Sequence, residues 1–218
     1  MCSKCKCHQP WWRRLLCRRR LLIITSTILI VVLTTATATV TAWAVLRPRK
    51  PSITLQDITI SAFNVSIASD NQTYLLSSTF QVTVSSRNPF GNRHSILYDG
   101  LRIHMSYHDQ QITPATRLPP TYEGRGGVDV WSPFVCGVSV PIAPYNALAL
   151  KQDQSDGFVI MKVKLQGHVR WRPGFFTFGG FISVDCPAYI PTGSENRGVP
   201  LGFNAVKYRL MQSCSVSL

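Results

Sequence analysis

The longest apolar stretch of the chain runs from Leu21 to Leu46 and holds 26 residues without a charged side chain. Basic residues flank it on both sides, at Arg18 to Arg20 and at Arg47 to Lys50. A helix rises about 1.5 Å per residue, so this stretch reaches roughly 39 Å and exceeds the ~30 Å hydrocarbon core of a bilayer. The pattern predicts one transmembrane helix over residues 21–46, preceded by a tail of residues 1–20.

A cleaved secretory signal is the alternative interpretation of the same stretch. Leu21 to Leu33 has the length of a signal core, and Ala42-Trp43-Ala44 resembles a cleavage site. The segment before the core is 20 residues long, and the uncharged run continues well beyond a usual signal core. Both lengths favour an uncleaved anchor. A buried helix of a soluble protein would instead show a polar stripe.

After a proline-containing stalk at residues 47–52, the pattern changes to period-2 alternation, which is typical of half-buried β-strands. In Leu101–Tyr107, for example, Leu101, Ile103, Met105 and Tyr107 fall on one face, with Arg102 and His104 on the other. Turn signals rich in Gly, Pro, Asn and Asp separate the segments, and we find no convincing amphipathic helix. The sequence predicts an all-β fold, a β-sandwich of about seven strands over residues 53–218. The expected strand segments are 53–60, 63–67, 79–85, 101–107, 128–140, 158–171 and 175–184.

Charge predicts the orientation of the span. Seven basic residues and no acid precede it, whereas only three basic residues follow it closely. Positive charge stays on the cytoplasmic side, so we expect a cytoplasmic tail that faces the anionic inner leaflet and a lumenal or extracellular sandwich. The formal net charge is +13, but residues 51–218 hold 13 basic and 10 acidic residues, which leaves +10 in the first 50 residues. This distribution does not support nucleic-acid binding.

Four cysteines lie in the predicted tail: Cys2, Cys5, Cys7 and Cys17. The first three, with His8, have zinc-like spacing, but no second ligand pair follows before the span. Juxtamembrane cysteines among basic residues are typical of reversible S-acylation. We expect acylation of one or more of the four, with unmodified thiols or a metal site as the alternatives.

The expected sandwich contains two glycosylation sequons, at Asn64 and Asn71, and three cysteines. Both asparagines are candidate acceptors if this part of the chain leaves the cytosol. Cys186 ends a clear strand segment and Cys214 lies in the final segment, so we expect a disulfide between them in an oxidising compartment. Cys136 has apolar neighbours and is expected to be a small buried thiol.

Several short motifs occur in a fairly specific order and spacing, at residues 47–51, 82–89, 98–99 with Tyr107, 118–124, 169–174 and 184–186. Together they make residues 40–190 resemble the plant NDR1/HIN1-like proteins of the late-embryogenesis-abundant type 2 superfamily. Two positions depart from the usual pattern: Phe90 follows the Asn-Pro pair, and Tyr122-Glu123 replaces an aromatic-glutamine pair.

The resemblance implies an immunoglobulin-like β-sandwich on a plasma-membrane anchor, with roles in plant defence, stress or contact between membrane and cell wall. We expect Asn88 and Pro89 to be structural, because proline suits a strand end and asparagine bonds to neighbouring backbone. The remaining motif residues carried over as structural are Tyr98, Asp99, Pro119, Gly124, Arg170 and Gly174.

Catalysis and cofactors are not expected. The histidines at 94, 104 and 108 are not spaced with carboxylates as metal ligands are, and no H-E-x-x-H or G-x-S-x-G motif occurs. Three hypotheses remain, in descending order: a cell-surface defence or stress component acting through protein or cell-wall contacts, a lipid-binding sandwich, and an enzyme.

Overall fold

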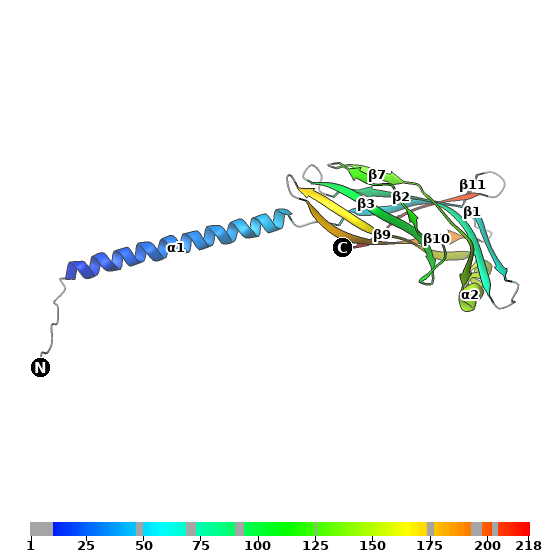
Figure 1. Ribbon diagram of the computed structural model, residues 1–218, viewed down its shortest axis with the longest axis horizontal. Helices are drawn as coiled ribbons and strands as arrows, with labels where there is room; N and C mark the ends of the chain where they lie inside the picture. Colours follow the sequence, from blue (N-terminus) through cyan, green and yellow to red (C-terminus); the bar gives the residue numbers. More distant parts are fainter. Residues whose placement is uncertain are drawn as a thin grey trace, which may run out of the picture. The chain divides into compact units, whose positions relative to one another are not determined.

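A computed structural model describes residues 11–46, 50–68, 73–89, 94–124, 126–173, 177–192, 198–201 and 205–218. The chain divides into two compact units, Met1–Arg47 and Pro48–Leu218. The first is helical and the second is built from two β-sheets and one helix (Figure 1).

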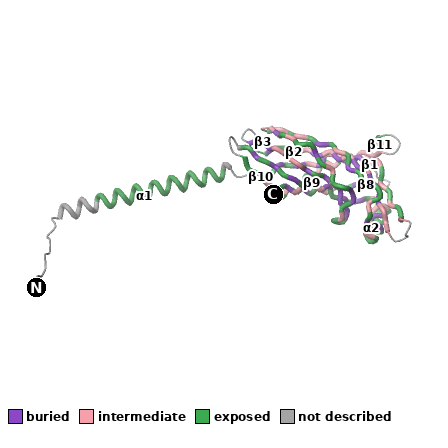
Figure 2. The backbone as a smooth tube through the Cα atoms, in the orientation of Figure 1, coloured by how far each residue is buried: buried purple, intermediate pink, exposed green. Residues whose placement is uncertain are grey.

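The first unit contains helix α1 (Trp11–Leu46), which is 36 residues long. It begins ahead of the predicted span, because nothing between Trp11 and Arg20 interrupts helical hydrogen bonding. Its segment Arg19–Ala44 is long and apolar enough to cross a membrane, and its residues are exposed (Figure 2). The threonines satisfy their hydroxyls locally: Thr25 donates to the Leu22 carbonyl at 3.0 Å and Thr41 to the Thr37 carbonyl at 2.9 Å.

The second unit is a sandwich of two antiparallel sheets, as the sequence predicts. The first sheet has the order β11-β12-β1-β2-β7, with β8 also paired to β2. Its strands are β1 (Ser52–Ile67), β2 (Tyr74–Arg87), β7 (Val128–Trp131), β8 (Phe134–Ile142), β11 (Val199–Pro200) and β12 (Val206–Ser213).

The second sheet has the order β13-β10-β9-β3-β4, with β5 and β6 also paired to β3. Strands β9 and β10 pair along their whole lengths, and β9 pairs with β3 on its other side. The strands are β3 (His94–Tyr107), β4 (Gln110–Gln111), β5 (Thr116–Arg117), β6 (Thr121–Glu123), β9 (Phe158–Pro173), β10 (Phe178–Pro191) and β13 (Ser215–Ser217).

Seven of the described strands have eight or more residues, namely β1, β2, β3, β8, β9, β10 and β12. Two expected segments, 53–60 and 63–67, form the single strand β1, which continues through a register shift between Ile60 and Ala62. The expected segment 128–140 is instead divided between β7 and β8 at Pro133, which has no N–H for a ladder. The remaining strands are two to four residues long, too short to show alternation.

Helix α2 (Pro144–Asp156) is an element that the sequence does not predict, and it is not amphipathic. Periodicity does not reveal it because only Asn146, Ala147 and Leu150 are buried. The sequence does carry boundary signals, with Pro144 in the first turn and Gly157 in a left-handed C-cap at φ 90°.

The core lies between the sheets and takes side chains from both, such as Phe80 and Val82 from β2 and Ile103 and Val163 from β3 and β9, each 0% exposed. Leu101, Ile103, Met105 and Tyr107 are buried, which confirms the predicted face of that strand. In Figure 2 buried and exposed positions alternate along the strands.

The structure joins Cys186 of β10 to Cys214, the pairing expected from the sequence, with 4.3 Å between their Cα atoms. Cys214 lies where the chain passes from one sheet to the other, and its N–H donates to the Ile53 carbonyl at 2.9 Å. The expectation of a buried Cys136 is wrong, because Cys136 is exposed. Val135 and Gly137 take the inward positions of β8, and the apolar neighbours Phe134 and Val138 also face outward.

Candidate functional site

Asn88, at the end of β2, forms hydrogen bonds to the start of β3 and to the loop that follows β6. It is 3% exposed, and its side-chain amide donates to the carbonyls of His94 at 2.7 Å and Gly124 at 3.2 Å. Its backbone N–H donates to the Gly127 carbonyl at 3.3 Å. These contacts hold the end of β2 against the start of β3 and the loop after β6, which supports a structural role for Asn88. Pro89 follows it, exposed, in a turn.

Tyr98 belongs to a buried polar cluster with Ser86 and Glu123. The Tyr98 hydroxyl lies 2.7 Å from Ser86 Oγ, and both hydroxyls contact Glu123 Oε2, at 3.0 and 3.1 Å. The edge of the cluster is closed by Trp131, whose ring meets that of Tyr98 edge-on at 5.2 Å. Because all three members are at most 1% exposed, this cluster is closed to a ligand.

Burial raises the pKa of Glu123, and hydrogen bonds from Tyr98, Ser86 and the Asn88 backbone lower it in part. Burial also raises the pKa of Tyr98 far above its usual value. The cluster is not apparent from the sequence, although the departure at Glu123 from the family pattern is a signal for it.

Asp99 and Arg170, two other motif residues, meet on the solvent-facing side of the second sheet. Asp99 Oδ2 lies 3.4 Å from an Arg170 guanidinium nitrogen. Two depressions of about 540 and 420 Å³ adjoin here and share Gly100, His168 and Phe181. We call them together the outer groove. Its other lining residues are Asp99, Val169, Arg170, Gly179 and Gly180 in the first depression and Arg102, His104, Gln111, Ala115, Gln166 and Gly167 in the second.

A kink in β3 shapes the floor of the outer groove. The register between β3 and β9 shifts between Asp99 and Arg102, and Gly100 there has a φ of +66°. The backbone of β3 comes so close to Gly167 that a Cβ at that position would lie 2.7 Å from Leu101 Cα. Gly179, in contrast, faces open space, where a Cβ would have no neighbour within 4 Å.

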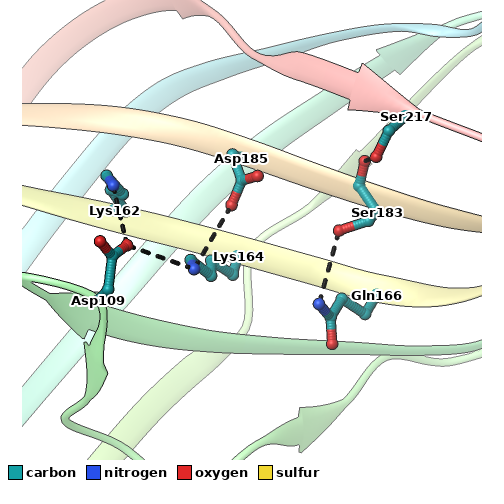
Figure 3. A network of polar contacts seen from close by, with 7 residues as sticks. All are labelled: Asp109, Lys162, Lys164, Gln166, Ser183, Asp185 and Ser217. Carbon is teal, nitrogen blue, oxygen red and sulfur yellow. Dashed lines mark hydrogen bonds and ion pairs between the residues drawn. The ribbon is translucent and has the colours of Figure 1, made fainter.

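Beside the outer groove, two lysines of β9 form ion pairs with acids (Figure 3). Lys162 Nζ lies 2.9 Å from Asp109 Oδ1, and Lys164 Nζ lies 3.7 Å from the same oxygen and 4.0 Å from Asp185 Oδ1. Gln166, next along the strand, donates to Ser183 Oγ at 3.5 Å. This row therefore contributes little net charge.

Arg102 is the uncompensated cation of the outer groove. Within the part of the chain that the structure describes, no carboxylate lies within 4.0 Å of the guanidinium of Arg102 or of Arg117, its neighbour on β5. The pKa of His104 is lowered by burial and then by Lys164, so its imidazole is neutral near pH 7. Besides the Asp99–Arg170 ion pair, the outer groove consequently presents one free guanidinium, with neutral polar groups around it.

The other predicted site residues are dispersed. Asn64 is exposed on β1, and Pro119 is exposed and accepts a hydrogen bond from Thr121 Oγ1 at 3.1 Å. The described residues include no group of three or more His, Cys, Asp or Glu that could hold a metal. Asn71, Cys2, Cys5, Cys7 and Gly174 lie outside the described residues, as does the side chain of Cys17.

The sequence indicates the groove only in part. Asp99 and Arg170 are motif residues, and alternation places Arg102 and His104 on the outward face of β3. His168, Phe181 and the glycines are not indicated as site residues. Alternation along β9 places His168 on the same face as Arg170, but the sequence does not show that Phe181 is its partner on β10.

Comparisons with known proteins identify the family. The chain is 50% identical over 177 residues to NDR1/HIN1-like protein 1 of Arabidopsis thaliana, covering 81% of this chain and 83% of that protein. It is 46% identical to NDR1/HIN1-like protein 12 of the same plant, with 81% of each covered. A solution structure of another Arabidopsis protein matches with 17% identity and a TM-score of 0.32, covering 68% of this chain and 86% of that one. No protein-family model matches the chain. Its identity to these relatives, over most of their length, shows that the chain belongs to the NDR1/HIN1-like family.

Proposed function

We propose that this protein is a non-enzymatic, single-pass plasma-membrane protein of plant defence or stress responses, whose sandwich contacts proteins or the cell wall outside the cell. The observation that carries the proposal is the apolar helix segment Arg19–Ala44 at the start of a chain of the NDR1/HIN1-like family.

The distribution of charge supports an inward-facing N-terminus. Of the ten basic residues in the first 50 positions, seven precede the uncharged run that begins at Leu21, and no acid accompanies them. A basic tail next to a span is attracted to anionic headgroups by about 1 kcal/mol per residue near the surface. Acylation of Cys2, Cys5, Cys7 or Cys17 would add a second attachment on the same side.

The outer groove supports a contact role for the sandwich. It lies on the open face of the second sheet, it has one unpaired guanidinium at Arg102, and it exposes the ring of Phe181, which is 52% accessible. Concave surfaces with an aromatic side chain and a few convergent polar groups are typical binding sites. The buried Glu123 cluster, in contrast, supports only the fold.

Lipid binding is the second candidate function. A partly apolar depression of about 230 Å³ is lined by residues of both sheets and of α2, among them Ile60, Phe63, Gln154, Ile190 and Tyr208. This volume is below the roughly 300–1,000 Å³ of usual ligand pockets. Mass spectrometry of the purified protein would favour this alternative if it recovered a stoichiometric lipid.

A fluorescent protein fused to the C-terminus, imaged in plant cells after plasmolysis, tests the proposal. We expect the signal to follow the retracting plasma membrane and to include strands that stay attached to the wall. Glycosidase treatment should increase gel mobility, and the double variant Asn64→Gln/Asn71→Gln should lose that shift. A signal that fills the space left behind the membrane would show a cleaved signal peptide, and a cytosolic signal would refute membrane anchoring.

A further inference from the structure

We propose that the outer groove binds an acidic polysaccharide, a linear chain of sugar carboxylates. The inference rests on the proposed function, because it requires the sandwich to face the cell wall, and it names the chemical class that this face recognises.

The floor of the outer groove fits a sugar ring. Gly100 and Gly179 leave open space along it, because a Cβ at either position would have no neighbour within 4 Å, and the backbone of Gly167 and Gly180 completes the lining. Beside this floor stands Phe181, with His168 edge-on to its ring at 5.7 Å between centroids. The C–H face of a pyranose ring is apolar and flat, so it stacks on an exposed aromatic ring and removes both from water.

The charge of the outer groove selects an acidic sugar. The Arg102 guanidinium has a planar fork of donors that binds a carboxylate with two parallel hydrogen bonds. The neighbouring cations Lys162 and Lys164 are engaged by Asp109 and Asp185, so Arg102, with Arg117 beside it, is free for a ligand. The neutral imidazole of His104 and the amides of Gln111 and Gln166 supply donors and acceptors for sugar hydroxyls.

An acidic peptide fits this face less well than a sugar chain. Extended peptides gain affinity by adding a strand to a sheet edge. The groove lies over β9, whose backbone is paired with β3 on one side and β10 on the other. The backbone of β9 is therefore not available for strand addition, and a chain bearing hydroxyls can bind the groove without backbone pairing.

Binding of calcium-free polygalacturonate to the detergent-solubilised full-length protein tests the inference, with fully methyl-esterified pectin and polyglutamate as comparison polymers. We expect polygalacturonate to bind and the two comparison polymers to bind at least tenfold more weakly. Arg102→Gln should lower the affinity for polygalacturonate about tenfold because one charged contact is lost. Gly179→Leu should lower the affinity similarly, because the new side chain fills open space in the groove.

Arg209→Gln is the matched control, because Arg209 is an exposed arginine on β12 of the other sheet. This variant should bind polygalacturonate as the unmodified protein does. Absence of polygalacturonate binding would overturn the inference. So would equal binding of polyglutamate or of the esterified polymer, or equal losses in Arg209→Gln and Arg102→Gln. Because the plasmolysis experiment reads membrane location without any sugar probe, failure of the inference can be distinguished from failure of the proposed function.

Discussion

At the scale of single residues, Gly167 is a position of the second sheet where the packing leaves no room for a Cβ atom. The kink of β3 at Gly100 brings backbone atoms to 2.7 and 2.9 Å from the place where a Cβ would stand. Neither atom belongs to a side chain that could rotate away. The same close approach shapes the outer groove, so the fold and the candidate site depend on one small residue.

Replacing Gly167 by Ala should therefore lower the free energy of unfolding by about 1–3 kcal/mol, as overpacking does. Urea unfolding of the solubilised protein, followed by circular dichroism of the β-sheets, measures the loss. Gly179→Ala is the matched control and should be nearly neutral, because a Cβ there meets nothing within 4 Å. Equal stability of both variants would contradict the described approach of β3 to β9.

Glu123 should make stability depend on pH. Burial raises its pKa above the ordinary value of 4.5, so the folded state holds the proton more tightly than the unfolded state does. Its stabilising contribution is complete below pH 4.5 and is lost as the pH rises through the folded-state pKa. The Glu123→Gln side chain cannot titrate, so this variant should show a flatter dependence of the free energy of unfolding on pH above 4.5. The same decline between pH 4.5 and 7 in both proteins would refute the assignment to Glu123.

At the scale of elements, the disulfide fastens the last segment of the chain to the sandwich. Cys214 separates β12 in one sheet from β13 in the other, and its partner Cys186 is in β10, which also pairs with β13. With only three residues, β13 has few backbone hydrogen bonds of its own. The cross-link therefore supports an element that would otherwise fray.

Cys214→Ser should cost about 2–4 kcal/mol of unfolding free energy, the usual range for a native disulfide, and amide exchange of β13 should become faster. Hydrogen exchange read by mass spectrometry reports both changes. Cys136→Ser is the control and should leave both unchanged, because that thiol is free and exposed. An unchanged β13 in Cys214→Ser would show that strand pairing alone holds it.

Element by element, the sequence predicted what depends on local periodicity. The alternation of Leu101, Ile103 and Met105 identified a strand and its buried face. Helix α2 is not predicted, because its buried side is only Asn146, Ala147 and Leu150, too few residues to produce a helical periodicity of apolar positions. Cys136 was misplaced because apolar residues stand on both faces of β8.

At the scale of the whole molecule, two different sequence patterns predict the two units. The length of the uncharged apolar run predicts α1, and the alternation of apolar and polar residues predicts the strands of the sandwich. The outer groove could not be predicted as a site, because it needs strand neighbours that are distant in sequence. Asp99 on β3, Arg170 on β9 and Phe181 on β10 meet only after the register of two strand pairs is set. The kink at Gly100 adds a local shift that no periodicity shows.

The central claim, that the sandwich lies outside the cell on a membrane anchor, can be tested with the exposed thiol of Cys136. Intact plant protoplasts that express the full chain are treated with a membrane-impermeant maleimide before lysis. We predict labelling of the unmodified protein in intact cells and its loss in Cys136→Ser, with the tail cysteines reactive only after permeabilisation and removal of acyl groups. Labelling of tail cysteines in intact cells, with Cys136 protected until lysis, would contradict the proposed orientation.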